Sequence, residues 1–377
     1  MRIVLVCPNL PPKMDACGDG TDRLAREFVS RGDAVLVISD ADGAARSRPY
    51  RVASVGARFD LKAAARALRE TARFDPDAAF VQYTPFLYRP ESLFPILFTR
   101  GVRQAGTPLG IYAHECFYSL GSVAVRGRLK QCYLSLRDAA VFKAASCVFA
   151  PTAEKQQRIS ARLPATKTLL MPVGANVEPA EVWAHRTPQA PFRLLTFGVV
   201  MPRRRIELGI RALALLREAG VAADLNIAGR VWDPSYVQAC TELAAELGVL
   251  PSVRFLGSLS PASLSAEFFA ADLCLHTAVE GAITSSGALL AALAHGLPTI
   301  AARTAHDEAC FARAVVFAEP TAADLANACA RLLADRGAAS ALAISARRLY
   351  DDCFGWGRIA SAIESALSPL QPCQAAV

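Results

Sequence analysis

The sequence predicts an α/β protein with two doubly wound parallel sheets, each in a domain of its own. Short apolar runs alternate with amphipathic segments along the chain, and this alternation is typical of βαβ units. The length of 377 residues exceeds what one hydrophobic core usually accommodates. Because the strand pattern also stops and then restarts near the middle of the chain, we expect two domains of similar size.

The first half contains five apolar runs with the length of buried strands. Amphipathic segments separate them, such as Asp22–Arg31, in which Leu24, Ala25 and Phe28 share one face. We expect residues 1–176 to form the N-terminal domain. Its expected strands are Ile3–Cys7, Ala34–Ser39, Ala79–Gln82, Leu109–Ala113 and Cys147–Ala150.

The second half begins after Ala175–Pro191, a proline-containing stretch without clear periodicity that predicts a linker. We expect residues 177–355 to form the C-terminal domain, and residues 356–377 to add a helix over Gly357–Leu367 that packs back across the domain junction. The expected strands of this half are Phe192–Phe197, Asp224–Ala228, Val253–Leu256, Leu273–His276, Thr299–Ala301 and Val315–Phe317.

The composition narrows the class of protein. Hydrophobic residues make up 53% and charged residues 20% of the chain, which excludes a disordered or fibrous protein. The net charge of +7 is scattered, so nucleic acid is not an expected partner, whereas a nucleoside diphosphate or an anionic membrane surface suits it. The 11 cysteines include no C-x-x-C pair, so neither a disulfide framework nor a metal site is expected.

The sequence favours a cytoplasmic protein, with peripheral membrane contact left open. The N-terminus enters a strand pattern directly, and no apolar run reaches the length of a membrane span. The stretch Val125–Lys143 mixes cations with apolar side chains. It favours an ordinary amphipathic helix, and a helix that lies on an anionic membrane is the alternative. Its cations are Arg126, Arg128, Lys130, Arg137 and Lys143, and its apolar residues are Leu129, Tyr133, Leu134, Leu136 and Phe142.

Two stretches of the first half could carry chemistry, because ligands of doubly wound sheets bind beyond the carboxyl ends of the strands. Gly18, Asp19, Gly20 and Thr21 follow the first strand, where glycines and a helix start favour an anion, although a plain surface turn is the alternative. A third glycine is missing, which disfavours dinucleotide binding. His114 and Glu115 follow the fourth strand. The imidazole could hydrogen-bond a hydroxyl or move a proton, or it could be structural.

Two stretches of the second half suit phosphate. After Gly198 come Arg203, Arg204 and Arg205, which could grip a diphosphate or form a solvated basic turn. Glu280 precedes Ser285, Ser286 and Gly287, where a helix over Ala288–His295 is expected to start. Amides and hydroxyls at a helix start bind phosphate, and a serine that caps the helix is compatible with that role.

In the order and spacing of these stretches the chain resembles the family-4 retaining glycosyltransferases, within a bacterial branch. The resemblance covers nearly the whole chain. It rests on the stretches above together with Val81–Pro85, Pro172–Asn176, Phe197–Gly198, Ile227–Gly229, Phe255–Gly257 and Ser286–Pro298. It implies the GT-B architecture, in which two Rossmann-like domains face a central cleft. The C-terminal domain would bind a nucleotide-sugar, and the N-terminal domain would bind the acceptor.

The resemblance also implies roles for single residues. Arg204 stands where the family has a diphosphate-binding Lys, Val199 replaces an Arg, and Ala291 replaces a ribose-binding Glu, whereas Glu280 fits the family's first acidic position. The resemblance places the following residues at the donor: Gly198, Arg203, Arg204, Gly229, Glu280, Ser285, Ser286 and Gly287. It places His114 near the reacting sugar, and we expect His114, Arg204 and Glu280 to be the catalytic residues. The residues expected at the acceptor and phosphate are Gly18, Asp19, Gly20, Thr21, Gln82, Tyr83 and Glu115.

The expected activity is therefore transfer of a sugar from a nucleoside-diphosphate sugar to an acceptor, with retention of configuration. We expect no metal and no cofactor besides the nucleotide-sugar co-substrate. Two alternatives remain open at this point. One is a nucleotide-sugar epimerase or phosphorylase of the same architecture. The other is a catalytically silent binding protein, which the Val199 and Ala291 departures favour.

Overall fold

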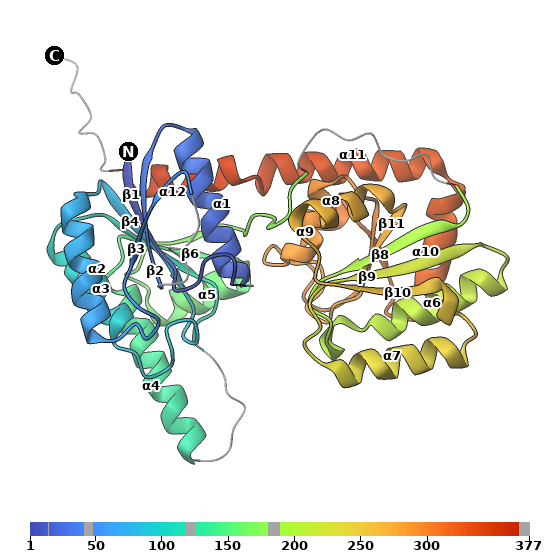
Figure 1. Ribbon diagram of the computed structural model, residues 1–377, viewed down its shortest axis with the longest axis horizontal. Coiled ribbons are helices and arrows are strands. Elements are labelled where there is room, and N and C mark those ends of the chain that lie inside the picture. The colour runs from blue at the N-terminus through green and yellow to red at the C-terminus, as the bar shows by residue number, and fades with distance from the viewer. Residues whose placement is uncertain (14, 41–47, 118–124, 180–188, 369–377) are drawn as a thin grey trace. The chain divides into compact units, whose positions relative to one another are not determined.

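The computed structural model describes residues 1–13, 15–40, 48–117, 125–179 and 189–368 (Figure 1). It divides the chain into two compact units. Unit 1 consists of Met1–Gly174 and Trp356–Val377, and unit 2 consists of Ala175–Gly355. Each unit has a parallel sheet covered by helices on both faces. The predicted α/β class, with two doubly wound parallel sheets, is confirmed.

The sheet of unit 1 has the strand order β3-β2-β1-β4-β5-β6-β7. The chain builds outward from β1 to β3, and then returns to pair β4 with the other side of β1. This reversal puts the topological switch point between β1 and β4. The strands are β1 Arg2–Val6, β2 Ala34–Ser39, β3 Arg51–Ser54, β4 Ala78–Tyr83, β5 Leu109–Ala113, β6 Cys147–Ala150 and β7 Thr168–Leu170.

Alternate side chains of β1 enter two separate cores, as the period of two in a strand requires. Val4 and Val6 pack with α2, α3, α4 and α5, whereas Ile3 and Leu5 pack with α1 and α12. Figure 1 shows α2 and α3 on one face of this sheet and α1 and α12 on the other. The helices are α1 Ala16–Ser30, α2 Leu61–Phe74, α3 Phe94–Gln104, α4 Val125–Phe142, α5 Ala153–Arg162 and α12 Trp356–Leu367.

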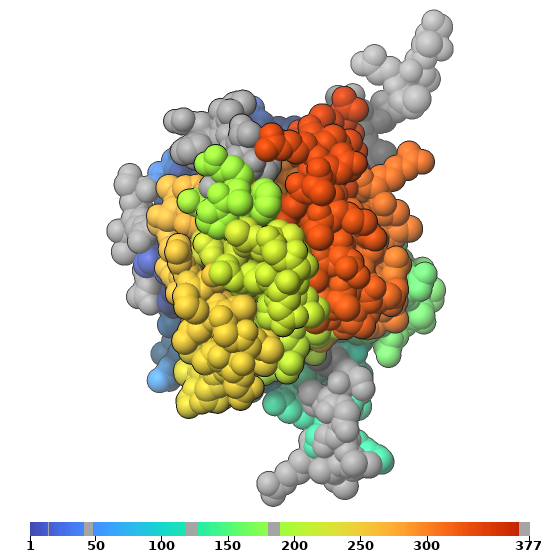
Figure 2. All heavy atoms as spheres, turned by 90° about the vertical axis from the view of Figure 1, so that its right-hand side faces the viewer, coloured from blue at the N-terminus to red at the C-terminus, as the bar shows by residue number. Residues whose placement is uncertain are grey.

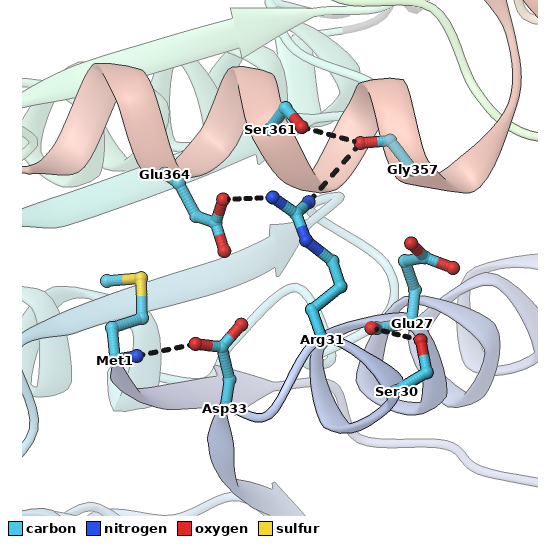
Figure 3. A network of polar contacts seen from close by, with 8 residues as sticks. All are labelled: Met1, Glu27, Ser30, Arg31, Asp33, Gly357, Ser361 and Glu364. Carbon is cyan, nitrogen blue, oxygen red and sulfur yellow. Dashed lines mark hydrogen bonds and ion pairs between the residues drawn. The ribbon is translucent and has the colours of Figure 1, made fainter.

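The C-terminal helix α12 is held on unit 1 by apolar and charged contacts. Its residues Ile363 and Leu367 are buried in the core that α1 shares. At the end of α1, Arg31 donates to the Gly357 carbonyl at 3.3 Å and pairs with Glu364 at 2.6 Å (Figure 3). Gly174 leaves room for the Trp356 ring, since a Cβ atom there would lie 2.5 Å from it.

The sheet of unit 2 has the order β10-β9-β8-β11-β12-β13, with its switch point between β8 and β11. Its strands are β8 Phe192–Phe197, β9 Ala223–Ala228, β10 Val253–Gly257, β11 Leu273–His276, β12 Thr299–Ala302 and β13 Val316–Ala318. Its helices are α6 Ile206–Glu218, α7 Pro234–Glu246, α8 Pro261–Ala270, α9 Gly287–Ala294, α10 Ala322–Ala334 and α11 Arg336–Cys353, with short 3-10 turns η2 Pro202–Arg204, η3 Leu250–Ser252 and η4 Ala309–Arg313.

Strand β8 again distributes its side chains to two cores. Leu194 packs with α6, α7 and α10, whereas Leu195 packs with α8 and α9. Figure 2 shows the outer surface of this unit, where the yellow and yellow-green atoms of α6 and α7 lie beside the red atoms of its last helices. Side-chain caps start several of these helices: Asp233, Ser260 and Thr321 each accept a hydrogen bond from an amide of the first turn.

Two expectations about helices are corrected. Helix α1 begins at Ala16 rather than at Asp22, because Asp15 caps it by accepting from the Gly18 amide. Gly18, Gly20 and Thr21 are therefore buried helical residues and not a loop. In the stretch Val125–Lys143, Arg137 is not a surface cation. It is fully buried and donates to the backbone carbonyls of Pro85, Arg89 and Pro90.

The described part of the chain contains no helix that is both long and apolar enough to cross a membrane. The side chain of Arg126 and most of the expected linker, residues 180–188, lie outside the described residues.

Candidate functional site

The predicted site residues of unit 2 follow β8, β9 and β11, at the carboxyl ends next to the switch point. Gly198 and Gly229 follow β8 and β9, with φ of 137° and 143°. A Cβ atom on Gly229 would lie 1.8 Å from the Gly198 carbonyl oxygen, and one on Gly198 would lie 2.8 Å from Nε of Arg204. Only glycine fits these two positions, and the close approach seats the Arg204 guanidinium against the backbone.

The three consecutive arginines have different environments. Arg205 has a φ of 47° and donates from Nε to the Thr277 carbonyl at 2.6 Å, so it ties the loop after β8 to the loop after β11. Arg203 is exposed and donates to Oε1 of Glu280 at 2.8 Å. Arg204 is half-buried, and none of the described residues makes a hydrogen bond to its guanidinium. Desolvation lowers the pKa of Arg204, because burial disfavours the charged form, and an anionic ligand would stabilise that charge.

Glu280 has one carboxylate oxygen without a hydrogen-bond partner among the described residues. Its Oε1 accepts from Arg203, whereas its buried Oε2 has no hydrogen-bond partner among the described residues. Burial alone would raise the pKa of Glu280. The hydrogen bond from Arg203 and the charges of Arg203 and Arg204 outweigh burial and lower the pKa, so the group is ionised at neutral pH.

His276, at the end of β11, is a site residue that the sequence analysis missed. It is buried and its Nε2 lies 3.0 Å from the Gly281 carbonyl oxygen. Burial and the nearby Arg204 charge lower its pKa to about 4. The neutral ring therefore donates from Nε2 to Gly281 and fixes the loop that follows Glu280. An apolar strand that ends in His was the available signal.

The start of α9 has the properties of an anion site. Ser286 is the cap and accepts from the Leu289 amide at 3.4 Å. The backbone amides of Ser285, Gly287 and Ala288 have no hydrogen-bond partner within the described residues. They are thus available to phosphate oxygens. Ala291, where the resemblance expects a ribose-binding glutamate, is fully buried in the core under α9.

In unit 1 the structure brings together four polar residues, one from β4, two that follow β5 and one from α5. His114 Nε2 lies 2.6 Å from Oε1 of Gln82. Lys155 donates to the His114 carbonyl at 2.6 Å and pairs with Glu115 at 3.1 Å. Burial and the Lys155 charge lower the pKa of His114 to about 3. A ring that stays neutral is suited to hydrogen-bond a hydroxyl and unsuited to store a proton at neutral pH. Lys155 was not predicted.

The remaining predicted residues of unit 1 divide into two groups. Asp19 is half-buried in the first turn of α1, and burial, Asp15 and Asp22 raise its pKa to about 6. The hydroxyls of Thr21 and Tyr83 instead make hydrogen bonds within unit 1. Thr21 donates to the Cys17 carbonyl, and the fully buried Tyr83 donates to Asp138 at 2.6 Å. The expected role of the Tyr83 side chain at an acceptor is therefore corrected, because its hydroxyl faces the core.

No group of three or more His, Cys, Asp or Glu residues in the described ranges is arranged to hold a metal ion.

A family comparison matches part of unit 2. Residues 191–335, which include β8 to α10 and less than half of the chain, match the family model "Glycosyl transferases group 1". A search of the curated proteins finds no significant match.

Three solved structures are similar over the whole chain. Anabaena HepE (Alr3699) in complex with UDP and glucose is 18% identical, with a TM-score of 0.70 and coverage of 98% of this chain and 99% of that chain. WaaG, a glycosyltransferase involved in lipopolysaccharide biosynthesis, is 18% identical, with a TM-score of 0.65 and coverage of 97% and 99%. A glycosyltransferase from Rickettsia africae is 13% identical, with a TM-score of 0.69 and coverage of 97% of each chain. The chain thus has the GT-B fold, and its residues 191–335 form a glycosyltransferase group 1 domain.

Proposed function

We propose that the protein transfers a sugar from a nucleoside-diphosphate sugar to an acceptor, with retention of configuration, as the family-4 resemblance implies. The observation that carries this proposal is the half-buried Arg204 guanidinium. It has no hydrogen-bond partner among the described residues, and it follows the strand next to the one that leads into α9. A fixed cation and unused amides on neighbouring loops suit a diphosphate.

The proposed chemistry is departure of the nucleoside diphosphate. When the bond between the anomeric carbon and the diphosphate oxygen breaks, negative charge develops on that oxygen. An oxygen of the acceptor would form the new bond to the anomeric carbon, and the proton of its hydroxyl would pass to the departing diphosphate. Arg204 and the amides of Ser285, Gly287 and Ala288 would stabilise this charge from fixed positions. Arg203 would hold Glu280, whose Oε2 would accept from a hydroxyl of the sugar or of the nucleotide. Arg204 would do this without a metal ion, so transfer should persist in EDTA.

Unit 1 would supply the acceptor side. The neutral His114 would hydrogen-bond the reacting sugar, while Gln82 and Lys155 hold the ring and the backbone of His114 in place. Glu115, together with Asp19 at the start of α1, would contact the acceptor. Uridine diphosphate is the first nucleotide to test, because it is bound in the solved structures of Anabaena HepE.

The experiment is a screen followed by a product analysis. Thermal shifts with UDP, GDP, ADP and dTDP identify the nucleotide, since a ligand of the native state raises its melting temperature. The matching nucleotide-sugars are then incubated with the protein, and the products are followed by NMR. Released nucleoside diphosphate together with a sugar of retained anomeric configuration supports the proposal.

Other products of this screen would contradict the proposal. An epimerised donor would instead show an epimerase, phosphate-dependent release of a sugar phosphate would show a phosphorylase, and binding without turnover would show a silent protein.

A further inference from the structure

The loop between β11 and α9, residues 277–286, carries Glu280 and leads to the free amides of α9. Its first half is fixed to the loop after β8. Thr277 donates from Oγ1 to the Arg204 carbonyl at 2.6 Å, and the Val279 amide donates to the Arg203 carbonyl at 2.9 Å. These contacts place Glu280 next to Arg203. They do not reach the second half of the loop, which other residues must hold in place.

Besides the hydrogen bond from His276 to the Gly281 carbonyl, two consecutive carboxylates after β12 hold the second half. Asp307 accepts at Oδ1 from the Ala282 amide at 2.8 Å, and Glu308 accepts at Oε2 from the Thr284 amide at 2.7 Å. The Glu308 amide in turn donates to the Ala282 carbonyl at 2.9 Å. Carboxylates that accept from backbone amides form strong, directional hydrogen bonds.

Asp307 is itself fixed in place. Its Oδ2 accepts from the Thr304 amide at 2.8 Å and its Oδ1 from the Thr304 hydroxyl at 3.1 Å. Gly281 has a φ of 75°, and a Cβ atom there would lie 2.1 Å from Oγ1 of Thr304. The backbone of the loop after β11 thus packs against side chains of the loop after β12. No residue with a side chain fits at the position of Gly281.

We propose that Asp307 and Glu308 are positioning residues of the donor site. They bind the amides of Ala282 and Thr284 and leave those of Ser285, Gly287 and Ala288 for the diphosphate. Neither carboxylate touches the donor. They act by fixing the backbone whose amides bind the donor. This inference rests on the proposed function, and it adds a fourth loop, after β12, to the three loops, after β8, β9 and β11, that carry the predicted donor residues.

The variants are chosen to separate positioning from stability. Asp307→Ala and Glu308→Ala remove the acceptors. Glu308→Gln keeps an oxygen acceptor for the Thr284 amide and should rescue. Asp335→Ala is the matched control in the same unit, because Asp335 is also a carboxylate bound to a backbone amide, that of Ala338 at 2.9 Å, at the start of α11.

Two measurements are made on the full chain. Hydrogen exchange without ligand should rise over residues 281–288 in Asp307→Ala and Glu308→Ala, and stay at the wild-type level there in Glu308→Gln and Asp335→Ala. Calorimetric titration with UDP should show affinity lowered about tenfold in the two alanine variants of the proposal, since each loses one charge-assisted hydrogen bond to the loop between β11 and α9.

Unchanged exchange over residues 281–288 in both alanine variants would overturn the inference, as would equal losses in Glu308→Gln and Glu308→Ala. Wild-type UDP affinity in the alanine variants would also overturn it. If the wild-type protein bound no nucleoside diphosphate at all, the proposed function would fail, whereas the hydrogen exchange would still decide whether the carboxylates fix the loop.

Discussion

Arg203, Arg204 and Arg205 show how neighbouring residues of one type come to differ in use. Arg205 has a left-handed backbone, and its guanidinium donates to carbonyls of the loop after β11. Its side chain therefore has a structural role. Arg203 points to Glu280. Arg204 lies against Gly198, because only a glycine there leaves room for its guanidinium. Three consecutive arginines in the sequence do not reveal which of them has which environment. The environments depend on the φ of one residue and on a glycine six positions earlier.

We expect Arg204→Ala to raise the dissociation constant of UDP by about 10-fold to 100-fold, because a hydrogen bond from a charged group contributes about 1.5–3 kcal/mol. Isothermal titration calorimetry measures this. The control is Arg211→Ala, which removes an exposed arginine of α6. Similar affinities for the two variants would show that Arg204 does not bind the diphosphate. Arg205 is not a suitable control, because its loss should loosen the loop.

His114→Ala should lower the transfer rate and leave UDP affinity unchanged, because His114 belongs to unit 1 and the proposed donor residues belong to unit 2. The wild-type rate should also show no imidazole titration between about pH 5 and 8. The folded pKa of about 3 lies below the ordinary value of 6.5, so the ring is already neutral throughout this range. A pH–rate profile with a step near pH 6.5 that disappears in His114→Ala would contradict this assignment.

At the scale of elements, strands were predictable where both faces are buried. The runs Ala34–Ser39, Leu109–Ala113 and Cys147–Ala150 were predicted with the observed bounds, because parallel strands covered on both sides are largely apolar. Strands β3 and β7 were missed. They are short edge strands whose side chains are mostly half-buried or exposed, so they lack that pattern.

Helix α4 has an apolar stripe that no described residue covers. Leu129, Tyr133 and Leu136, spaced by four and three residues, are exposed by 65%, 39% and 67%. They lie on the opposite side of the helix from the buried Leu134 and Val141. Figure 1 shows the first turns of α4 extending away from the sheet of unit 1. The exposed charged side chains of these turns are cations, Arg128 and Lys130.

We expect the protein to sediment with anionic vesicles at low salt and to be released at high salt. Each cation near such a surface contributes about 1 kcal/mol, and the leucines add apolar burial. The variant Leu129→Gln with Leu136→Gln should stay in the supernatant. Ile344→Gln, which changes an exposed apolar residue of α11, is the control and should sediment as the wild type does. Equal sedimentation of the double variant and the wild type would mean that the stripe does not bind the membrane.

At the scale of the whole molecule, the two sheets and the donor loops after β8 and β11 could be predicted, because strands, glycines and helix starts leave local patterns. Lys155, Asp307 and Glu308 could not. Each contacts a partner that is more than 20 residues away in the sequence. A charged residue in a loop or in the first turn of a helix is usually exposed, so the local sequence does not indicate such a contact. The role expected for the Tyr83 side chain failed for the same reason, because Asp138, 55 residues further along the chain, decides where its hydroxyl points. The loop expected over Gly18 and Gly20 was wrong for a local reason, because Asp15 caps α1 before the apolar pattern begins.

The return of the chain to unit 1 at Trp356 gives the last prediction. The Trp356 ring is 8% exposed and packs in the core of unit 1 against Gly174. We expect Trp356→Ala to lower the free energy of unfolding by about 3–5 kcal/mol, as truncation of a buried tryptophan does. UDP affinity should be kept, because the proposed donor residues lie in unit 2. Trp232→Ala is the matched control for stability. Its ring is 63% exposed, so its removal should change the melting temperature little. Differential scanning calorimetry of the two variants decides the point. A Trp356→Ala protein that melts like the Trp232→Ala protein would show that α12 contributes no stability through this contact, and that only the charged pair of Arg31 and Glu364 and the remaining apolar residues hold it on unit 1.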